Sequence, residues 1–301
     1  MSDRVALVFG KEGQIARALA DAPWPRGWRL VTAGRERCDL RTGDEIPIAV
    51  LLEAERPSVV INAAAYTAVD KAEDEPDLAA AVNARAPGLI AAACAARALP
   101  VLHISTDYVF DGEKRTPYTE DDAVRPLSVY GRTKADGETA IRERRADHVI
   151  LRTSGVFSAH GHNFVKAMLS LARDGRALDV VDDQCCCPTF AGDLARVLVD
   201  LATRLAVGPG APRGTFHYAG AGPITWHGFA QAIFERAGPL GLPRPPALRR
   251  TTSPAFAARA PRPKYSVLDC TKIAASYGIE RASWQQGLDA CLEALSGSGS
   301  A

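Results

Sequence analysis

The sequence predicts an α/β protein built on a doubly wound parallel sheet, with a smaller region of mixed structure in its C-terminal half. Up to about residue 155, short apolar runs that end in glycine or small polar residues alternate with helix-forming segments. This alternation is typical of buried parallel strands joined by crossover helices. Beyond that point the alternation weakens and glycine and proline become frequent, which predicts a second, less regular region.

The expected strands and helices follow from hydrophobic patterning. Strands need continuous apolar runs bounded by turn formers, and helices need longer segments of helix-forming residues. The expected strands are 4–9, 28–33, 58–62, 101–105 and 148–152, with another near 215–218. The expected helices are 14–19, 45–55, 78–98 and 130–142, followed by 163–173, 190–205 and 226–237. The proline-rich stretch 239–263 is expected to be an ordered loop over a pocket, with a flexible surface loop as the alternative.

Length and composition exclude several classes of protein. The 301 residues are 47% hydrophobic and 24% charged and carry a formal net charge of +1. That balance allows a sizeable core and gives no general attraction to nucleic acid or to an anionic membrane. The most apolar stretch, 89–102, is interrupted by Arg97 and Pro100, so we expect no membrane span. With no N-terminal signal pattern either, we expect a cytoplasmic protein.

The seven cysteines form no C-x-x-C pair and have no metal-ligand spacing. Four are scattered singly, which indicates reduced, buried thiols. The run Cys185–Cys187 is interpreted as small apolar loop residues, with a metal or redox role as the weaker alternative. We therefore predict no metal site.

A glycine turn follows the first expected strand directly. Gly10, Gly13 and Ala16 have the spacing G-x-x-G-x-x-A between strand and helix. Glycines let the backbone turn tightly and approach a pyrophosphate at the positive end of the helix, as in dinucleotide-binding, Rossmann-like folds. A plain glycine turn is the alternative. The candidate cofactor-binding residues here are Gly10, Lys11, Gly13, Gln14 and Ile15.

The end of the second strand bears on the choice of cofactor. NAD-selective folds commonly place an acidic residue there to bind the ribose 2′-hydroxyl. This chain instead has Arg35, with Lys11 in the glycine turn, and two cations favour the 2′-phosphate of NADPH. Solvated surface cations are the alternative, and NADH stays possible. Asp39 and Leu40 then offer a carboxylate and a backbone edge beside an adenine.

The next two strands end in residues suited to a ligand crevice. The third runs into Ala63, Ala64, Ala65 and Tyr66, where small side chains permit close approach of a ligand to the backbone. The fourth delivers Thr106 to the same edge of the sheet. A threonine hydroxyl there is a candidate for contact with a substrate oxygen.

Tyr130 and Lys134 lie four residues apart on an expected helix, so their side chains share one face. A nearby ammonium lowers the free energy of a phenolate, and such a pair can exchange a proton with a substrate oxygen. The pair alone is weak evidence for catalysis, because the same spacing arises by chance on many amphipathic helices.

Several ordered motifs together resemble the extended short-chain dehydrogenase/reductases, and within them the dTDP-4-dehydrorhamnose reductase family. The resemblance covers nearly the whole chain. The motifs are Phe9–Gln14, Ala63–Glu73, Ser105–Phe110, Tyr130–Glu138, Asp183–Gln184 with Pro188–Thr189, Thr225–His227, Arg262–Leu268 and Trp284–Leu288.

The resemblance implies hydride transfer from a nicotinamide cofactor to the 4-keto carbon of a dTDP-linked 6-deoxy-L-hexulose, giving dTDP-L-rhamnose. Tyr130 would donate a proton to the developing alkoxide, and Lys134 would lower the pKa of Tyr130 and hold the nicotinamide ribose. Thr106 would orient the same oxygen. Ala63, Ala64, Ala65 and Tyr66 would line the cofactor. Val69, Asp107 and Tyr108 would face the sugar, and Arg262 would bind the diphosphate or, as readily, anchor its loop through a salt bridge.

The resemblance also implies a division of the chain. We expect residues 1–155, with a later return at about 189–215, to form the NADP-binding domain. Residues 156–188 and 216–295 would form the substrate-binding lobe, and 296–301 a flexible tail. A homodimer stays open.

Two departures from the family pattern leave the sugar open. Gly155 stands where the family commonly has a tryptophan beside the sugar, and Cys185–Cys187 replace other residues in a substrate-side loop. The alternatives are therefore a reductase of another nucleotide-linked keto sugar, or a non-catalytic NADP-binding regulatory subunit. The intact set of Thr106, Tyr130 and Lys134 weighs against the last.

Overall fold

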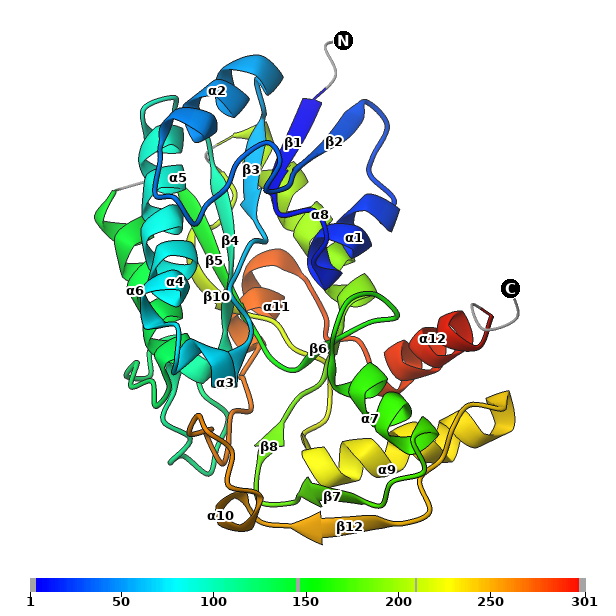
Figure 1. Cartoon of the computed structure of the whole chain (residues 1–301). Helices are drawn as coiled ribbons and strands as arrows, with labels where there is room; N and C mark the ends of the chain where they lie inside the picture. The colour runs from blue at the N-terminus through cyan, green and yellow to red at the C-terminus, as the bar shows by residue number, and fades with distance from the viewer. Residues whose placement is uncertain (1–3, 145–146, 209, 298–301) are drawn as a thin grey trace.

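The computed structural model describes residues 4–144, 147–208 and 210–297, and its centre is a six-stranded parallel sheet (Figure 1). The order across the sheet is β10-β5-β4-β3-β1-β2, and every pairing is parallel. The predicted doubly wound parallel sheet is therefore confirmed. The strands are β1 (Arg4–Phe9), β2 (Trp28–Ala33), β3 (Val59–Asn62), β4 (Val101–Thr106), β5 (His148–Thr153) and β10 (Gly214–His217).

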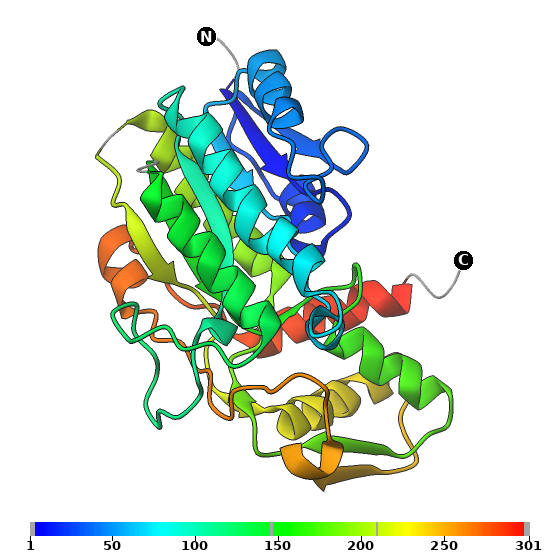
Figure 2. The same ribbon diagram turned by 60° about the vertical axis from the view of Figure 1, so that its left-hand side comes forward.

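Helices cover both faces of the sheet because the strands are buried on both sides. In β1, Ala6 and Val8 pack into the core on the side of α8, whereas Leu7 and Phe9 pack into the core on the side of α2. Figure 2 shows α5 and α6 running alongside one another over the sheet. The covering helices are α1 (Gln14–Asp21), α2 (Ile46–Glu55), α5 (Ala86–Ala95), α6 (Val129–Glu143) and α8 (Ala191–Val207).

The single helix expected over 78–98 is instead interrupted. It consists of α4 (Pro76–Ala80), a π-helical turn η1 (Ala81–Arg85) and α5. The wider turn places Asn83 so that its amide bonds both the backbone N–H and the carbonyl of Tyr66. Pro76–Ala95 has the length and hydropathy of a membrane span, but half of it is buried inside the protein and it packs against α6. It is therefore described as a helix of the protein core.

A smaller region lies below the carboxyl edge of the large sheet in Figure 1. Its own core is aromatic, with Phe229 in contact with both Phe157 and Trp284. Its helices are α7 (Phe164–Arg173), α9 (Trp226–Ala237), η3 (Gly238–Leu240), α10 (Ser253–Phe256) and α12 (Trp284–Gly297). Its two-stranded sheets pair β7 (Leu178–Val181) with β12 (Leu248–Thr251), β8 (Cys185–Cys186) with β11 (Ile224–Thr225), and β6 (Val156–Phe157) with β9 (Thr189–Phe190).

Three local expectations need correction. The proline-rich stretch 239–263 is not only loop, because it contains β12 and α10. Cys185 and Cys186 form a strand, since β11 offers them a partner that is distant in sequence. Residues 296 and 297 of the expected tail belong to α12, and 298–301 lie outside the described residues.

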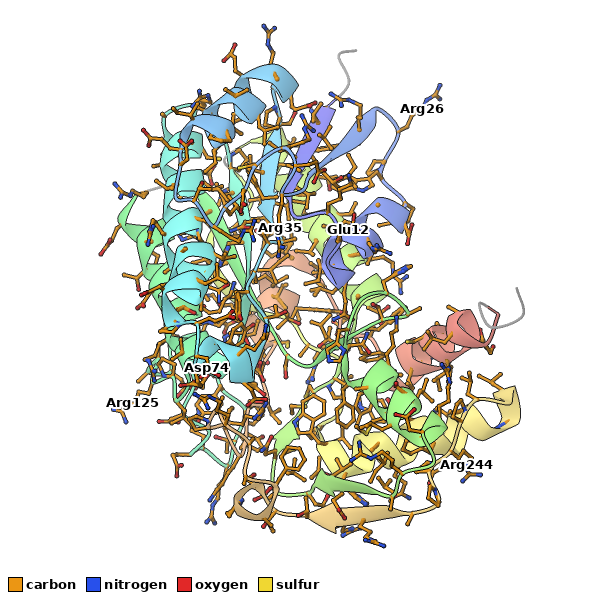
Figure 3. All side chains as sticks on the ribbon, in the orientation of Figure 1. Glu12, Arg26, Arg35, Asp74, Arg125 and Arg244 are labelled. Atoms are coloured by element: carbon orange, nitrogen blue, oxygen red, sulfur yellow. The ribbon has the colours of Figure 1, made fainter. Side chains whose placement is uncertain are left out.

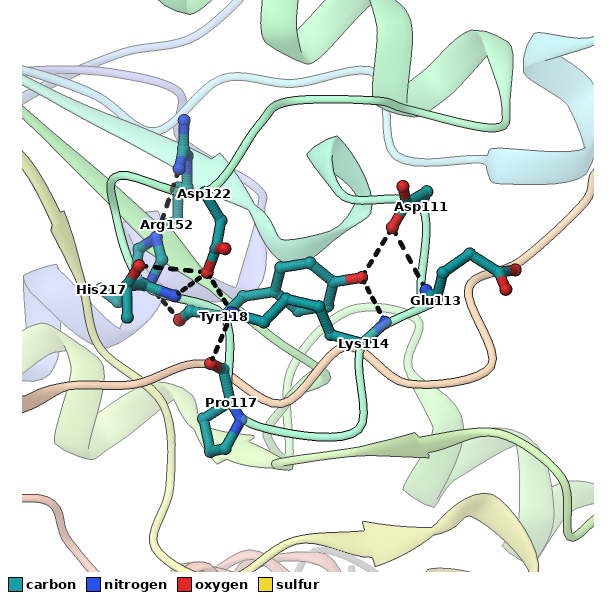
Figure 4. A network of polar contacts seen from close by, with 9 residues as sticks. Asp111, Glu113, Lys114, Pro117, Tyr118, Asp122, Arg152 and His217 are labelled. Atoms are coloured by element: carbon teal, nitrogen blue, oxygen red, sulfur yellow. Dashed lines mark hydrogen bonds and ion pairs between the residues drawn. The ribbon is translucent and has the colours of Figure 1, made fainter.

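The segment between β4 and α6 is an ordered loop held by side-chain contacts. Tyr118 stacks on Phe110 at 4.2 Å, and its hydroxyl donates to Asp111 at 2.7 Å (Figure 4). Lys114 pairs with Asp122 at 2.6 Å, and the carbonyl of Tyr118 lies 3.1 Å from His217 Nδ1. The short elements nearby are α3 (Val69–Ala72), η2 (Asp107–Val109) and α11 (Thr271–Tyr277).

Candidate active site

The candidate site begins where the winding direction of the sheet reverses. Strand β1 lies between β3 and β2, so the crevice outside the carboxyl ends of β1 and β3 is the topological switch point, where open α/β sheets bind ligands. Gly10 has φ +113°, and a Cβ there would lie 3.3 Å from the backbone of Ala63 and Ala64. Only glycine lets these two strand ends approach so closely.

A cleft of about 700 Å³ opens at this point and runs toward the smaller region. Its volume is in the range of small-molecule and cofactor sites. It brings together twelve of the predicted site residues: Gly13, Gln14, Ile15, Ala63, Ala64, Ala65, Val69, Thr106, Asp107, Tyr108, Tyr130 and Lys134. Its lining also includes residues of the smaller region, among them Phe164, Cys185 and Trp226.

Tyr130 lies in the first turn of α6. Ser128 caps the helix by accepting from the Gly131 N–H at 3.1 Å, and the Val129 N–H donates to Glu73 at 2.8 Å. Gly131 is required, since a Cβ there would lie 2.2 Å from the carbonyl oxygen of Tyr108. The rings of Tyr130 and Tyr108 meet edge to face at 5.8 Å. Helix capping and close packing therefore fix the phenol at the cleft.

Thr106 and Asp107 end β4 and face the same cleft. The Thr106 hydroxyl donates to Asp107 Oδ1 at 3.1 Å, accepts from the Tyr108 N–H at 3.2 Å, and hydrogen-bonds Tyr130. Ser154 donates to Asp107 Oδ2 at 2.8 Å. Burial raises the pKa of Asp107 to about 6, although hydrogen bonds from Ser266, Ser154 and Thr106 oppose the rise.

Lys134 extends from the next turn of α6 into the protein. It is 2% exposed, and its Nζ donates to the Ile104 carbonyl at 2.7 Å and lies 3.3 Å from His103 Nε2. Burial lowers the pKa of Lys134 to about 8, against the opposing charge of Glu138. The amine is therefore mostly charged at neutral pH and loses its charge as the pH rises above about 8.

Lys134 is not among the causes of the pKa shift of Tyr130 in this structure, so the expectation that Lys134 lowers that pKa stays a prediction. Burial raises the pKa of Tyr130 to about 12, the hydrogen bond between Tyr130 and Thr106 lowers it in part, and the charge of Asp107 raises it. The Lys134 amine is engaged by Ile104 and His103. Tyr130 is therefore protonated at neutral pH, which is the form that can donate a proton.

The cations expected near a 2′-phosphate lie at the ends of β1 and β2. Arg35, labelled in Figure 3, is exposed just after β2. Lys11 forms an ion pair of 2.9 Å with Glu36, a carboxylate that the sequence prediction left out. The hydrogen bond that Lys11 donates to Glu36 raises the pKa of Lys11. The prediction of two cations without a carboxylate is therefore wrong for the immediate surroundings of Lys11.

The remaining predicted cofactor residues, Asp39, Leu40 and Tyr66, do not line the cleft. A hydrogen bond from Arg41 lowers the pKa of Asp39 to about 2, so the Asp39 carboxylate is charged and binds Arg41. Leu40 packs on the core beneath β2. Tyr66 is held by Asn83 at its backbone and by Glu75 at its hydroxyl.

Arg262 pairs with Asp70 through contacts of 2.7 and 3.1 Å. The loop-anchoring alternative for Arg262 thus describes its contacts in this structure, while diphosphate binding stays a prediction. Asp70 also accepts from the Ala260 N–H at 3.0 Å, so it ties the loop at 260–262 to α3. Val69, at the start of α3, lines the cleft next to this contact.

An aromatic wall is present although residue 155 is glycine. Gly155 has φ +53°, and a Cβ there would point toward Pro188 at 3.3 Å, Trp226 Cη2 at 3.6 Å and Cys186 Sγ at 3.7 Å. Trp226 lines the cleft and packs on Phe164 with ring centroids 4.6 Å apart. Trp226 therefore borders the space that a side chain at 155 would enter.

Two cysteines reach this cleft. Cys185 and Cys186 line it, and burial raises the pKa of both thiols, so they are neutral. Within residues 4–144, 147–208 and 210–297, no group of three or more His, Cys, Asp and Glu side chains is arranged for a metal ion.

Sequence reasoning missed several polar residues of the site. Among the buried side-chain nitrogen and oxygen atoms of the described residues, Thr153 Oγ1 is the one without a hydrogen-bond partner. It lines the cleft at the end of β5, where a ligand can satisfy it. Asn163 orients Gln14 by a bond of 3.0 Å. Gln14 and Asn163 are 149 residues apart, so no local pattern reveals the contact.

Several features of the cleft suit a nicotinamide dinucleotide. Gly10 leaves the backbone bare at the switch point, Lys11 and Arg35 follow the ends of β1 and β2, and Thr153 offers an unsatisfied hydroxyl at the far end. The cleft has the volume for a cofactor together with part of a substrate. The residues that surround the cleft therefore fit a nicotinamide dinucleotide.

Comparisons with known proteins agree with this site. A family model described as the RmlD substrate binding domain matches residues 4–296. The dTDP-4-dehydrorhamnose reductase of Aggregatibacter actinomycetemcomitans is 39% identical over 283 residues, which are 94% of this chain and 96% of the relative. That of Escherichia coli is 38% identical, over 96% of this chain and 97% of the relative.

Solved structures give the same result. A dTDP-4-dehydrorhamnose reductase from Clostridium acetobutylicum has a TM-score of 0.87 and 34% identity, covering 97% of this chain and 99% of its own. One from Bacillus anthracis, solved in complex with NADP, has a TM-score of 0.89 and 30% identity, covering 98% of this chain and 100% of its own.

Proposed function

The chain belongs to the dTDP-4-dehydrorhamnose reductase family, and from this premise we propose how its own residues perform the reaction. The function is the nicotinamide-dependent reduction of a 4-keto group on a dTDP-linked 6-deoxy-L-hexulose, giving dTDP-L-rhamnose. One observation supports this assignment of residues: Thr106, Tyr130 and Lys134 lie in one cleft at the switch point of the sheet.

The bound cofactor supplies the hydride that reduces the keto carbon. Tyr130 donates its phenolic proton to the substrate oxygen as negative charge develops there, which its raised pKa permits at neutral pH. Thr106 hydrogen-bonds Tyr130 and is placed to orient the same oxygen. Lys134, anchored by the Ile104 carbonyl, is placed to hold ribose hydroxyls of the cofactor.

The proposed division of labour follows the two regions of the fold. Residues 1–155, with a return at about 189–215, bind the cofactor, and residues 156–188 and 216–295 bind the nucleotide sugar. Val69, Asp107 and Tyr108 face the sugar, and Arg262 exchanges its pairing with Asp70 for the diphosphate. Gly10, Gly13, Gln14, Ile15 and the run Ala63–Tyr66 surround the dinucleotide, with Asp39 and Leu40 beside its adenine.

We propose NADPH as the preferred cofactor, because Arg35 and Lys11 favour a 2′-phosphate. Glu36 opposes this preference by occupying Lys11, so NADH also serves. We further propose a cytoplasmic enzyme, which the seven free cysteines support. A homodimer stays a prediction that light scattering tests.

Absorbance of the reduced nicotinamide tests the proposed function. Purified protein is mixed with NADPH and enzymatically generated dTDP-4-dehydro-6-deoxy-L-hexulose, with Tyr130→Phe as the matched control. Turnover in the wild type alone supports the proposal, and equal rates in the two proteins contradict it.

One observation favours a different nucleotide-linked keto sugar as the substrate. Gly155, Cys185 and Trp226 form the wall of the cleft where the family commonly has a tryptophan beside the sugar. A panel of nucleotide-linked keto sugars, compared by kcat/KM, separates the two substrates. A non-catalytic regulatory subunit would bind NADPH and turn over none of them.

A further inference from the structure

The side chain of Gln14 joins the glycine turn to the smaller region of the fold. Gln14 is the first residue of α1, directly after the turn. Its Oε1 accepts from Ser158 Oγ at 2.9 Å and from Asn163 Nδ2 at 3.0 Å, and its Nε2 donates to the Val156 carbonyl at 3.4 Å. In Figure 1 this segment, which runs from β6 to α7, lies beside α1. One side chain therefore ties the start of α1 to the region that we assign to the sugar.

The neighbouring side chains of the turn bind within the large region instead. Lys11 donates to Glu36, and Glu12 accepts from Arg17, in pairs that are both exposed. The two donors to Gln14 Oε1, by contrast, are buried. Breaking a hydrogen bond costs more where water cannot take the place of the lost partner. The contacts of Gln14 therefore stabilise the arrangement of the two regions more than the exposed pairs do.

The hydrogens around Gln14 match the acceptors. Asn163 Oδ1 accepts from the Lys166 N–H at 3.2 Å, which caps α7 and turns the Asn163 NH₂ group toward the loop. That NH₂ group faces Gln14 Oε1 and the carbonyls of Ser158 and His160. The Ser158 hydroxyl has Gln14 Oε1 and the His160 carbonyl within reach. Two amide hydrogens and one hydroxyl hydrogen thus serve three oxygens, so every oxygen has a donor.

The loop 158–163 also packs against Gln14 and leads directly to the cleft. Gly161 has φ +63°, and a Cβ there would lie 3.2 Å from Gln14 Cγ. Phe164, which follows Asn163, lines the cleft and packs on Trp226 with ring centroids 4.6 Å apart. The contacts from Gln14 through Asn163 to Phe164 therefore run without interruption from the glycine turn to the aromatic wall.

We propose that Gln14 is a positioning residue for the reduction, which holds the loop 158–163 and the aromatic wall in place relative to the cofactor. We call Gln14, Ser158 and Asn163 the Gln14 clamp. The backbone N–H of Gln14 lies in the first turn of α1, where helix N–H groups have no partner within the helix and can bind a phosphate. A dinucleotide bound there fixes the backbone from which the clamp extends. The catalytic part of the proposal rests on the proposed function.

The clamp acts on the reaction through geometry. Hydride transfer needs the keto carbon and the cofactor at close and well-defined positions, and a small misplacement lowers the rate steeply. The two ligands are assigned to different regions of the fold, so the contact between these regions sets their relative placement. Loss of the clamp leaves Thr106, Tyr130 and Lys134 untouched but lets the loop move. We therefore expect kcat to fall more than the affinity for the cofactor.

Hydrogen exchange tests the clamp without any sugar. The N–H groups of His160 and Lys166 donate to Ser158 Oγ and Asn163 Oδ1, so their exchange follows the opening of the loop. In Gln14→Leu, which keeps most of the side-chain volume, we expect these amides to exchange about tenfold faster than in the wild type, the effect of roughly one lost hydrogen bond. Unchanged exchange overturns the proposal, whether or not the protein reduces any sugar.

Saturating NADP⁺, with binding checked by calorimetry, provides a second comparison. We expect NADP⁺ to slow the exchange of the loop in the wild type and to have little effect on it in Gln14→Leu. Slowing of the same size in both proteins overturns the proposal. If calorimetry detects no binding to the wild type, the proposed function fails and the catalytic part of the proposal fails with it.

Asp21→Asn is the matched control for the exchange experiment. Asp21 ends α1 and contacts His160 of the same loop at 3.4 Å, but on the exposed surface. It therefore joins the same two elements outside the clamp, and its exchange with and without NADP⁺ should match the wild type. An effect as large as that of Gln14→Leu would overturn the special role of Gln14.

Kinetics separate positioning from stability. In Gln14→Leu, kcat should fall about tenfold or more, while KM for NADPH changes by less than about threefold. Asn163→Asp is the reciprocal variant, because it keeps an oxygen for the Lys166 N–H but removes the NH₂ group that faces Gln14. The double variant should lose no more than the larger single loss. Additive losses, or a lowered Tm with unchanged kcat, overturn the proposal.

Discussion

Two buried charged residues lie one turn apart on α6, and their surroundings differ. Glu138 is bound by Arg152 at 2.7 and 2.8 Å and by Ser105 at 2.7 Å. Lys134 has no such carboxylate at hydrogen-bond distance among the described residues and rests on a carbonyl and an imidazole. Both side chains are at most 2% exposed. The fold thus satisfies one charge completely and leaves the other poorly stabilised at the cleft.

The pKa values express the same contrast. For Glu138, burial alone raises the pKa, but the hydrogen bonds and charges of Arg152, Ser105 and Arg142 together lower it to about 2. For Lys134, burial is the largest effect and lowers the pKa to about 8. Glu138 therefore stays charged under ordinary conditions, whereas Lys134 titrates near them. A buried charge that is paired with opposite charges contributes to stability, and a buried charge without such partners is available for catalysis.

Removing the proton donor at the cleft should have the largest effect. Tyr130→Phe deletes the hydroxyl that we assign to protonate the substrate oxygen, and we expect kcat to fall by about 10²- to 10⁴-fold. Because the ring contact with Tyr108 remains, Tm should change little. Steady-state kinetics and thermal unfolding check both parts. A large drop in Tm would mean that the hydroxyl has a structural role.

The matched pair Glu138→Gln and Lys134→Met tests the comparison itself. Glu138→Gln leaves the Arg152 guanidinium buried without its carboxylate, and we expect a loss of about 3 to 5 kcal/mol in the free energy of unfolding. Lys134→Met removes a desolvated amine, so the free energy of unfolding should stay within about 1 kcal/mol of wild type or rise. Urea titrations measure both values. Equal losses would contradict the contrast.

The pH dependence of stability should separate the two residues. The pKa of Glu138 is lowered on folding, so its contribution is present above about pH 4.5 and is lost as the pH falls toward 2. The pKa of Lys134 is also lowered, so the unfolded chain binds more protons between about pH 8 and 10.5, and stability rises with pH there. Differences between wild type and each variant, measured by urea unfolding across pH, isolate these contributions. An alkaline rise that persists in Lys134→Met would assign it to other groups.

The smallest effect is expected at the exposed cofactor end. Glu36→Gln frees Lys11 for a 2′-phosphate, so KM for NADPH should fall relative to that for NADH, by about fivefold at most because the ion pair is exposed. Glu12→Gln, which removes a neighbouring carboxylate paired with Arg17, is the control. A shift in both variants would indicate a general effect of net charge.

The sequence by itself determined the parallel sheet, the glycine turn and most of the residues around the cleft. Strands 4–9 and 28–33 and helix 226–237 were predicted with the bounds observed. These features are local: an apolar run, a glycine between strand and helix, or an i, i+4 pair is visible without knowledge of the fold. Tyr130, Lys134 and Thr106 meet because parallel strands end at a common edge.

Only the tertiary structure decided which groups bind or border these residues. Glu36 on Lys11, Asp70 on Arg262 and Trp226 beside Gly155 are contacts between distant segments. The π-helical turn before α5 and the position of His103 beside Lys134 likewise depend on packing across elements. Hydrogen-bond direction and burial are properties of the assembled neighbourhood, so no local pattern encodes them. For this reason the sequence identified Lys134, and the structure determined its burial and its contacts.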